Sequence, residues 1–220
     1  MKSKYLIFAL IIVAFFYVAS CAPVQQGQTV PKSGIGASQP AKEPSVQPKQ
    51  EISVEVKELL DKSKVKVNNI YYKYRGPQTG NNFYEFYVKG TKIKYIPYRE
   101  LKSLDKTESY DSIFIDKIAK TAQSYCIAAY CVYKGKKADL NYADAYISTA
   151  FDWVNSITQA KKVGEEVIDN RNTWKLETNE GILWVDTFYG MPLKIESGGK
   201  TFKFEQIAVN SVQDSDVSPS

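Results

Sequence analysis

The stretch that decides the fold is ILWVDTFYGMPLKIESGGKTFKFEQIAVN, residues 182–210. It contains three short runs in which apolar and polar residues alternate, namely 182–186, 193–196 and 201–209. Segments 187–192 and 197–199, which carry the glycines and the proline, separate these runs. Alternation with a period of two between turn residues is typical of β-strands joined by tight turns. The stretch therefore predicts three consecutive strands of an antiparallel sheet.

The same pattern continues on the N-terminal side of this stretch. Residues 162–169 alternate, Asn170-Arg171-Asn172 supplies a turn, and residues 173–177 alternate again. Asn179-Glu180-Gly181 then forms the turn into the strand at 182. Five short strands at a spacing of about 8 to 12 residues indicate an up-and-down antiparallel sheet, curved or nearly closed.

A second set of strands is predicted further upstream. The candidate strands are residues 65–74, 83–88, 93–96 and 112–116, and the first three are separated by the turn groups 76–80 and 89–91. Each of these two turn groups contains glycine, which adopts the backbone conformations that hairpin turns require. The upstream region therefore reads as a β-meander rich in tyrosine.

Two segments have helical rather than strand periodicity. Residues 53–64 place the apolar side chains around Leu59 on one face and charges on the other, which predicts a short amphipathic helix. Residues 142–157 do the same around Trp153 and predict a helix that packs against the sheet. Thr149 can instead cap a shorter helix that begins at that point.

The positive charge of the chain is concentrated near its N-terminus. The formal net charge is +5, and residues 1–50 hold five lysines and one glutamate, so they carry four of these charges. Residues 51–220 hold 24 basic and 23 acidic residues. A nearly neutral surface lacks the basic footprint that nucleic-acid binding needs, and we exclude that class of partner.

The composition also removes several kinds of catalysis. The sequence of 220 residues contains no histidine, which excludes Ser-His-Asp and Cys-His nucleophile pairs and histidine-ligated zinc. Three cysteines are too few for a four-thiolate metal site within one chain. We expect no metal, no cofactor and no enzymatic activity. An enzyme that relies on aspartate, tyrosine or lysine alone is the weakest alternative.

The N-terminus resembles an export signal. Lys2 and Lys4 precede an apolar run over residues 5–18, which is shorter than the roughly 20 residues of a membrane-spanning helix. Val18-Ala19-Ser20-Cys21 resembles the lipobox of lipoproteins, where cleavage precedes a cysteine that receives a lipid. The resemblance implies an exported protein, attached through Cys21 to the outer face of the cytoplasmic membrane or to another envelope membrane. The alternative is an ordinary signal anchor, or a signal peptide cut elsewhere, with Cys21 incidental.

Composition divides the chain into four parts. Residues 1–20 are the expected signal peptide, and residues 21–50 are a lipidated cysteine with a tether rich in proline, glutamine, glycine and serine. Residues 51–210 form the folded domain. Residues 211–220 are polar and acidic, and they predict a disordered tail.

The motifs of the C-terminal strands resemble those of a known group. The strand with Trp184-Val185-Asp186, the turn with Gly190-Met191-Pro192-Leu193-Lys194 and the strand Phe204–Asn210 are similar, in this order, to the LolA/LolB-like lipoprotein-carrier superfamily. The resemblance implies a mainly β fold, a strongly curved antiparallel sheet or open half-barrel with two or three covering helices. Asp186, Gly190 and Pro192 then shape the turn.

The resemblance also implies a ligand site on the concave face of the sheet. The candidate lining residues are Leu59, Tyr72, Phe86, Tyr95, Phe114, Trp153 and Trp184. A curved sheet with more apolar surface than its side chains can fill leaves a dry cavity suited to lipid tails. The alternative is that these aromatic side chains simply fill the core.

Cys126 and Cys131 are five positions apart in the folded domain. In an exported protein such a pair predicts a structural disulfide, and two unpaired buried thiols are the alternative. The spacing is not the C-x-x-C of redox enzymes, so a redox function is not expected.

These observations favour a membrane-anchored, extracytoplasmic, non-catalytic lipoprotein that binds a lipid or another hydrophobic ligand. The competing hypothesis is a structural or protein-interaction module of the cell envelope whose interior is fully packed. A cavity of several hundred Å³ lined by tyrosine, phenylalanine, valine and isoleucine distinguishes the two.

Overall fold

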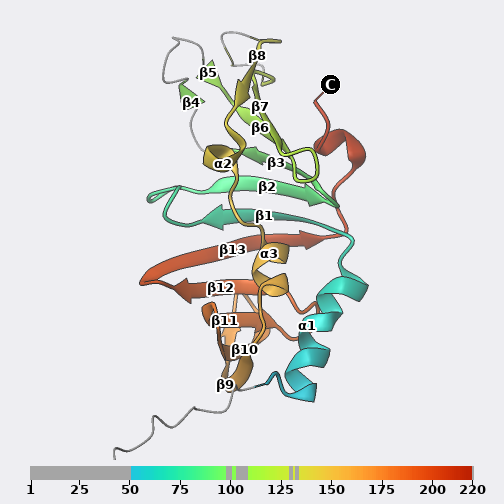
Figure 1. Ribbon diagram of the computed structural model, residues 1–220, viewed down its shortest axis with the longest axis vertical. Coiled ribbons are helices and arrows are strands. Elements are labelled where there is room, and N and C mark those ends of the chain that lie inside the picture. Colours follow the sequence, from blue (N-terminus) through green and yellow to red (C-terminus); the bar gives the residue numbers. More distant parts are fainter. Residues whose placement is uncertain (1–50, 98–100, 103–108, 129–130, 132–133, 220) are drawn as a thin grey trace, which may run out of the picture. The chain divides into compact units, whose positions relative to one another are not determined.

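An eleven-stranded antiparallel sheet with the strand order β8-β7-β6-β3-β2-β1-β13-β12-β11-β10-β9 forms the framework of the domain (Figure 1). The computed structural model describes residues 51–97, 101–102, 109–128, 131 and 134–219. The strands of this sheet are β1 (Asn69–Arg75), β2 (Tyr84–Lys89), β3 (Lys92–Ile96), β6 (Ser112–Asp116), β7 (Thr121–Tyr125), β8 (Lys137–Leu140), β9 (Ala160–Ile168), β10 (Arg171–Thr178), β11 (Gly181–Asp186), β12 (Pro192–Ser197) and β13 (Lys200–Val209). The small pair β4 (Leu101–Lys102) and β5 (Ser109–Tyr110) forms a separate sheet.

The large sheet is open, with β8 and β9 as its two edges. β9 to β13 follow one another as hairpins, and β13 then pairs with β1, the first strand of the chain. In the described residues, three α-helices and one short 3-10 helix accompany the sheet. The predicted fold class, a mainly β protein with an open, curved antiparallel sheet and covering helices, is confirmed.

The sheet has two chemically different faces. On the face that we call the inner face, apolar side chains from alternate positions of β1, β2, β3 and β6 pack against the helices. Leu176, Leu183 and Ile195 continue this face on the C-terminal strands. The opposite, outer face carries many charged and tyrosine side chains, as the register Tyr87 to Lys94 to Phe114 illustrates. The period-two alternation in the sequence produces this division.

The helix α1 (Val54–Lys66) covers the inner face on one side (Figure 1). Ser53 caps its N-terminus through a hydrogen bond from the Val56 backbone N–H to Ser53 Oγ, 3.4 Å long. The helix continues to Lys66, two residues beyond the predicted end. Val65, predicted as the start of the first strand, is helical and 79% exposed.

The segment predicted as one helix over residues 142–157 is divided in two, as the Thr149 alternative implies. It contains α2 (Tyr142–Ala145) and α3 (Ala150–Asn155), joined by extended residues. Thr149 and Asp152 form a capping box, in which each side chain accepts a hydrogen bond from the other residue's backbone N–H. Because this cap starts a new helix at Ala150, the chain cannot stay helical through Thr149. We call residues 142–157 the strap.

Residues 211–219 are not the free tail that their composition predicts. They contain the short helix η1 (Asp214–Asp216), and the side chains of Val212 and Val217 are 3% and 4% exposed. Local polarity predicts disorder for a segment in isolation, but contacts with a distant strand bury these two valines. No helix in the described part of the chain is long and apolar enough to cross a membrane.

The turn between β11 and β12 approaches α1 closely at Gly190. Its φ of +70° is in the left-handed region, and a β-carbon there would collide with the carbonyl oxygen of Leu59. Glycine is therefore needed both for the backbone conformation and for the close approach of the helix.

We expect Gly190→Ala to lower the free energy of unfolding by about 2 kcal/mol or more, because strain at positive φ and the helix contact act together. Gly164→Ala is the matched control, since its β-carbon would meet only Lys175 Cβ, at 3.9 Å. Urea denaturation of both variants measures the difference. Equal stability of the two variants would show that the turn does not constrain α1.

Candidate functional site

The centre of the inner face is a cluster of four buried aromatic rings, which we call the floor: Tyr72, Phe86, Tyr95 and Phe204. The Tyr72 and Phe86 ring centroids are 5.3 Å apart and nearly parallel. Phe86 and Tyr95 are also stacked, at 5.1 Å, and Phe204 meets Tyr72 edge-on at 5.2 Å. These distances are typical of directly packed aromatic pairs. Side chains therefore fill the middle of the inner face.

The strap lies across this floor, in front of the central strands in Figure 1. Its buried apolar side chains are small or branched, and they are Ala145, Ile147, Ala150, Val154 and Ile157. At one end of the strap, the Tyr95 hydroxyl donates a hydrogen bond to the Ala145 carbonyl, 3.0 Å away. At the other end, the Trp153 ring packs against Phe202 at 5.0 Å. The strap thus closes the inner face with short helices rather than with one long rigid element.

A polar cluster around Asp152 holds the strap to the sheet. Lys117 Nζ, from the turn after β6, lies 2.5 Å from Asp152 Oδ1. The Tyr146 hydroxyl and the Thr149 hydroxyl both donate to Asp152 Oδ2 at 2.6 Å, and the Thr149 backbone N–H donates at 2.7 Å. One carboxylate therefore joins the two halves of the strap to each other and to the turn at Lys117.

The ionisation of Asp152 reflects two opposing effects. Burial of the carboxyl opposes ionisation most strongly, but hydrogen bonds from Lys117, Thr149 and Tyr146 together lower its pKa below the usual value of 3.8. A carboxyl whose pKa is lowered in the folded state stabilises the fold above its unfolded pKa. That contribution is lost as the pH falls through the lower, folded value.

Tyr72 carries the one unusual polar atom of the floor. Its side chain is fully buried, and its hydroxyl meets no partner at hydrogen-bonding geometry within the described part of the chain. Burial raises the pKa of this hydroxyl well above 10. The Ala150 backbone N–H is near enough to lower this pKa slightly, but it does not reach hydrogen-bonding geometry with the hydroxyl. A buried hydroxyl without a hydrogen bond is costly, and so it calls for an explanation.

The structure brings together only part of the predicted ligand-binding set. Leu59, Tyr72, Phe86 and Tyr95 belong to one core cluster on the inner face, and Trp153 is partly buried against that cluster. Phe204, which completes the floor, was not among the predicted residues. The alternation of residues 201–209 predicts that Phe204 is buried, but it does not predict that Phe204 contacts Tyr72.

Phe114 and Trp184 point to the outer face, so their predicted position on the inner face is wrong. Phe114 is paired with Lys94, and Trp184 is paired with Lys175 and Lys194. The Trp184 ring is 2% exposed because these two lysines cover it, with their Nζ atoms 4.8 and 4.0 Å from the ring centroid. Lysine stems commonly cover apolar surface in this way.

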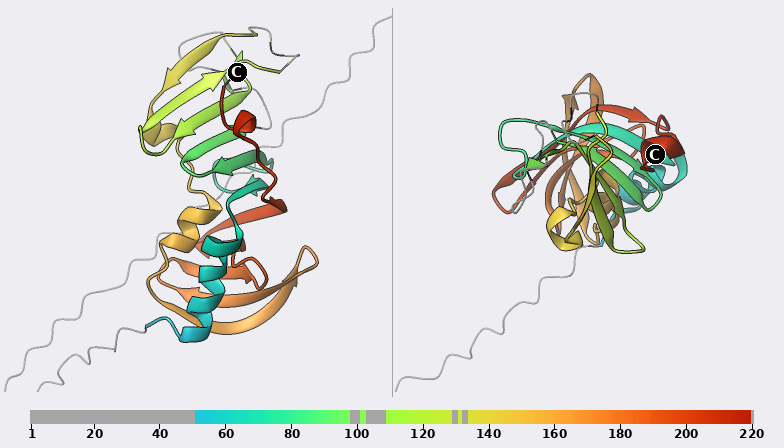
Figure 2. Two further views of the ribbon diagram at one scale, coloured as in Figure 1. Left: turned by 90° about the vertical axis from the view of Figure 1, so that its right-hand side faces the viewer. Right: turned by 90° about the horizontal axis from the view of Figure 1, so that it is seen from above.

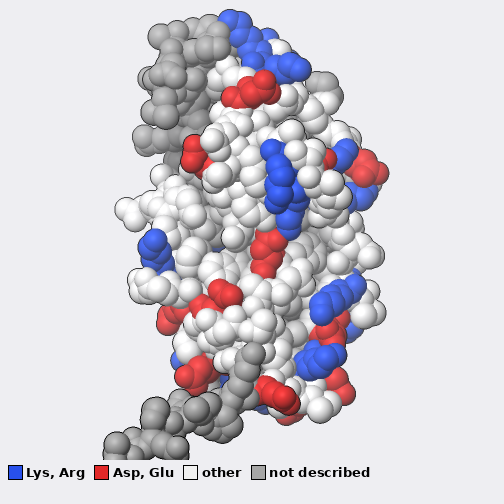
Figure 3. Space-filling view, viewed as in Figure 1, with Lys and Arg blue, Asp and Glu red and all other residues white. Residues whose placement is uncertain are grey.

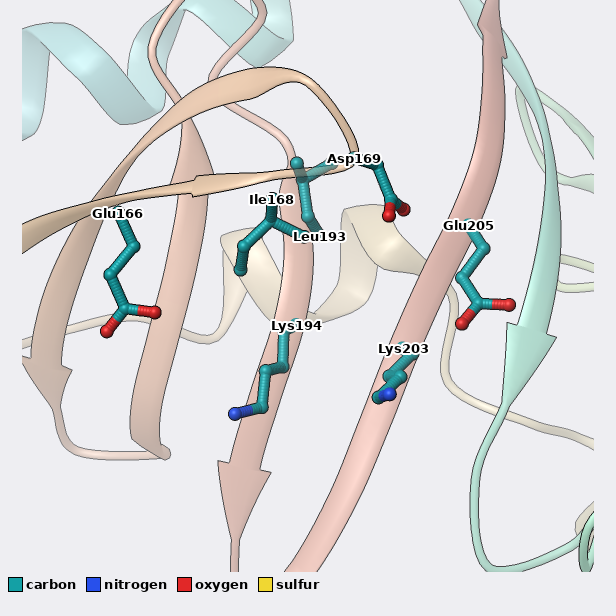
Figure 4. Close-up of a pocket in the computed structure, with 7 residues that line it drawn as sticks. All are labelled: Glu166, Ile168, Asp169, Leu193, Lys194, Lys203 and Glu205. Atoms are coloured by element: carbon teal, nitrogen blue, oxygen red, sulfur yellow. The ribbon is translucent and has the colours of Figure 1, made fainter.

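The cavity in Figure 4 lies on the outer face, below the hairpin that joins β9 and β10. It has a volume of about 260 Å³ and is lined by Glu166, Ile168, Asp169, Leu193, Lys194, Lys203 and Glu205. Another cavity on the same hairpin, of about 520 Å³, is also lined largely by polar side chains, with Glu165, Asn172 and Thr187 among them. Neither has the apolar lining expected of a lipid-tail cavity.

Asp186 organises the turn that the sequence motif marks. Its Oδ1 accepts hydrogen bonds from the Phe188 and Tyr189 backbone N–H groups, at 2.7 and 2.8 Å. Its Oδ2 accepts from Arg171, 3.0 Å away, and the same guanidinium also donates to the Ile207 carbonyl at 3.3 Å. Pro192 begins β12 opposite Val185. Asp186 thus connects the turn to both β10 and β13.

Cys126 and Cys131 form the predicted disulfide. The carboxylate of Asp111 lies beside them, with the three candidate ligand atoms within 4.8 Å of one another. Because the sulfurs are bonded to each other, they offer no thiolates to a metal ion. Asp111 instead accepts hydrogen bonds from the Ile127 and Ala128 backbone N–H groups, at 3.0 and 2.7 Å. Asp111 thus fixes the backbone of the two residues Ile127 and Ala128. Cys21 lies outside the described residues.

Charges of both signs are interspersed over the face seen in Figure 3. This pattern fits the near balance of basic and acidic residues in the sequence after residue 50. It gives no single-sign field that would attract a polyanion.

We expect Asp152→Asn to lower the free energy of unfolding by about 1 to 3 kcal/mol at neutral pH, since a charged hydrogen-bond acceptor is lost. The difference from the unaltered protein should begin to shrink near pH 3.8, where the unfolded carboxyl takes up a proton, and should shrink further as the pH falls towards the lower native pKa. Urea denaturation from neutral pH down to about pH 3 tests this. Asp144→Asn, at an exposed carboxyl of α2, is the control. A constant difference across that pH range would show that the Asp152 charge does not hold the strap.

No protein-family model matches the chain, and no curated protein matches it. Among solved structures, the MucA/MucB complex of Pseudomonas aeruginosa matches with 14% identity over 76% of this chain and a TM-score of 0.40. The chain spans only 60% of the length of the MucA/MucB chain that it matches.

Two further solved structures match over most of their own length. A DUF1329 family protein from Desulfovibrio piger matches over 77% of this chain and over all of its own chain, with 10% identity and a TM-score of 0.28. A putative outer membrane lipoprotein-sorting protein domain from Vibrio parahaemolyticus matches over 74% of this chain and over 94% of its own chain, with 9% identity and a TM-score of 0.28. The second is of the kind that the C-terminal motifs resemble.

Proposed function

We propose that this protein is an exported lipoprotein, held to a membrane by a lipid on Cys21, whose domain binds an apolar ligand such as a lipid acyl chain without catalysing a reaction. The ligand lies between the floor and the strap, and it enters when the strap moves away from the sheet. The export signal pattern supports the compartment, and so does the disulfide, because disulfides persist mainly in oxidising environments.

The construction of the strap supports its movement. α2 and α3 are four and six residues long, and helices this short depend on tertiary contacts for their stability. The strap is held by five buried apolar side chains, by partly buried aromatic side chains such as Trp153, and by the cluster around Asp152, which is partly exposed. Because its helices are too short to be stable alone, the strap opens at a lower free energy than the whole fold.

The observation that carries the proposal is the buried Tyr72 hydroxyl without a hydrogen bond in the middle of an apolar floor. Ligand sites are typically apolar surfaces with a few polar groups that fix the orientation of the ligand. A carbonyl or hydroxyl on an otherwise apolar ligand would give this hydroxyl the partner that it lacks. The hydroxyl therefore marks where such a ligand would be recognised.

The competing function, an interaction module with a filled interior, is favoured by the packing of the floor. Tyr72, Phe86 and Tyr95 stack directly on one another when the strap is closed. The two functions differ in one physical requirement. Binding of an apolar ligand needs the strap to leave the floor, whereas an interaction module does not.

The absence of catalysis in this proposal rests on how the titratable groups are used. The Asp152 carboxylate is occupied by hydrogen bonds from Lys117, Tyr146 and Thr149 that hold the strap. Asp186 is likewise occupied by a turn and by Arg171. Both carboxylates therefore stabilise the fold through their hydrogen bonds, and the proposed function requires no proton transfer from either of them.

Tyr72→Phe and Tyr74→Phe form a matched pair for testing the ligand site. Tyr74 is also buried, but its hydroxyl donates a hydrogen bond to Gln78 Oε1 at 2.8 Å. We expect Tyr72→Phe to raise the free energy of unfolding by about 1 kcal/mol, and Tyr74→Phe to lower it by about as much. Tyr72→Phe should also weaken binding of cis-parinaric acid, a fluorescent fatty acid, whereas Tyr74→Phe should not.

Native mass spectrometry of protein extracted from membranes provides the second measurement. A co-purifying lipid, reduced in Tyr72→Phe, is the expected result. If neither lipid nor cis-parinaric acid binds to the unaltered protein, the apolar-ligand proposal is wrong and the packed interaction module remains.

For the anchor, we expect Cys21→Ser to abolish incorporation of a fatty-acid label and to leave residues 1–20 attached, because lipidation precedes cleavage at a lipobox. Intact mass and labelling in the native host measure both effects. The double variant Cys126→Ser, Cys131→Ser is the control, and it should keep the label. Normal cleavage and labelling of Cys21→Ser would exclude the lipobox.

A further inference from the structure

Residues 211–219, which we call the C-terminal segment, cross the outer face of the sheet. Figure 2 (left) shows this segment, in red, passing over the green strands on the side away from the strap. It leaves β13, passes the ends of β1 and β2, and reaches β3 and β6. The helices cover the inner face of these same strands, so the segment supplies a cover for the other face.

Three contacts fix the path of the segment. The Val212 backbone N–H donates to Asn69 Oδ1 at 2.7 Å. Lys89 Nζ lies 3.0 Å from Asp214 Oδ1. Val217 lies with Phe114 and Gln123 around a cavity of about 160 Å³ that Pro219 also lines. The segment is therefore attached at both of its ends, with the acidic helix η1 between them.

An aromatic row lies on the outer face of the strands that the segment crosses. It consists of Tyr71, Tyr87, Phe114 and Tyr125, which we call the outer row. The Tyr71 and Tyr87 ring centroids are 5.0 Å apart, and those of Phe114 and Tyr125 are 5.2 Å apart. Lys94 lies between the two pairs, with its Nζ 5.4 Å from the Tyr87 ring and 5.5 Å from the Phe114 ring.

Phe114 and Val217 line the same cavity, so the C-terminal segment lies beside this end of the row. Phe114 is only 7% exposed although it points away from the helices. Val217 lines the same cavity and is itself buried. Burial raises the pKa of Tyr87 to about 12, and Asp216 adds a smaller effect in the same direction, which fits a carboxylate near the other end of the row.

Few contacts hold the C-terminal segment to the sheet. Val212 and Val217 are its only buried side chains. Asp214 is 89% exposed, and an ion pair so exposed contributes little to binding. The segment adds no strand to the sheet. With Val217 beside Phe114 and Asp214 beside Lys89, the segment resembles a short peptide in a docking groove.

We propose that the outer row is a docking surface for an extended peptide of a partner protein, and that the C-terminal segment occupies it as an intramolecular competitor. The fitting partner has two branched aliphatic residues five positions apart with carboxylates between them, the pattern of Val212, Asp214, Asp216 and Val217. Lys89, Lys92 and Lys94 lie on the same face and outnumber the carboxylates of β2, β3 and β6 on that face, Glu85 and Asp116, and Lys89 pairs with Asp214 of the segment. The surface lies opposite the proposed apolar-ligand site and does not depend on it.

The competition has a quantitative consequence. A segment attached to the surface that it covers acts at an effective concentration of the order of mM. A free peptide of the same sequence must therefore bind far more weakly to the whole protein than to a protein without the segment. If the segment is an integral part of the fold, removing it unfolds the domain, and the shortened chain then offers no surface to the peptide.

The experiment compares the full chain with a chain that lacks residues 211–220. The probe is the synthetic peptide SVQDSDVSPS, which has the sequence of residues 211–220, and binding is measured by NMR titration. We expect the shortened chain to bind the peptide with shifts at Tyr87 and Phe114, and the full chain to bind it at least about tenfold more weakly. A peptide with aspartate in place of both valines, and one with scrambled sequence, should not bind.

A second variant keeps the full length. Val217→Asp should release the segment and restore peptide binding, whereas Val167→Asp, at an exposed valine of β9, should leave the full chain unchanged. Lys89→Glu in the shortened chain should weaken binding. No binding to either released form, or equal binding of the native and scrambled peptides, overturns the proposal. Unfolding of both the shortened chain and Val217→Asp also overturns it, because the segment would then be an integral part of the fold.

Discussion

The pairing of β1 with β13 is the contact on which the rest of the structure depends, because it joins the first strand of the domain to the last. Tyr74 lies opposite Phe204, and Ile70 lies opposite Val209, so inner-face residues of the first and last strands of the domain meet. A register shift between Tyr71 and Lys73 interrupts the ladder, and such irregularities bend a strand. Without this pairing, the two sets of hairpins would form two separate small sheets.

Side chains reinforce this junction at both ends. The Arg75 guanidinium lies 2.8 Å from Glu205 across the two strands. Asn210 accepts a hydrogen bond from the Asn68 backbone N–H and donates another to the Lys66 carbonyl, so it connects the end of α1 to the end of β13. The position of α1 over the inner face is therefore set by the same junction that aligns the floor.

Much of the fold could be predicted because its signals are local. The strands from residue 162 onward follow from alternation and from turn residues between them, and the structure places β9 to β13 where these patterns predict. The strap was ambiguous because helical periodicity and the Thr149 cap point to different boundaries. The cap decides the outcome, since its hydrogen bonds with Asp152 can form only if a helix starts there.

The errors at Phe114 and Trp184 have a common physical cause. In residues 112–115 and 183–186 every side chain is buried, so alternation no longer distinguishes the two faces of the strand. Phe114 is paired with Lys94 and Trp184 with Lys194, and this register decides that both rings lie on the face away from the helices. A single sequence does not reveal the register between strands that are distant in the chain. The C-terminal segment was misjudged for the same reason, because its two valines are buried by strands more than a hundred residues earlier.

The two faces of the central strands are mechanically connected. Tyr71 and Tyr87 of the outer row are sequence neighbours of Tyr72 and Phe86 of the floor, so the same backbone carries both surfaces. In the two proposals, the strap leaves the inner side of these strands and the C-terminal segment leaves their outer side. A sheet covered on both faces by short, polar-anchored segments is therefore suited to binding on either side.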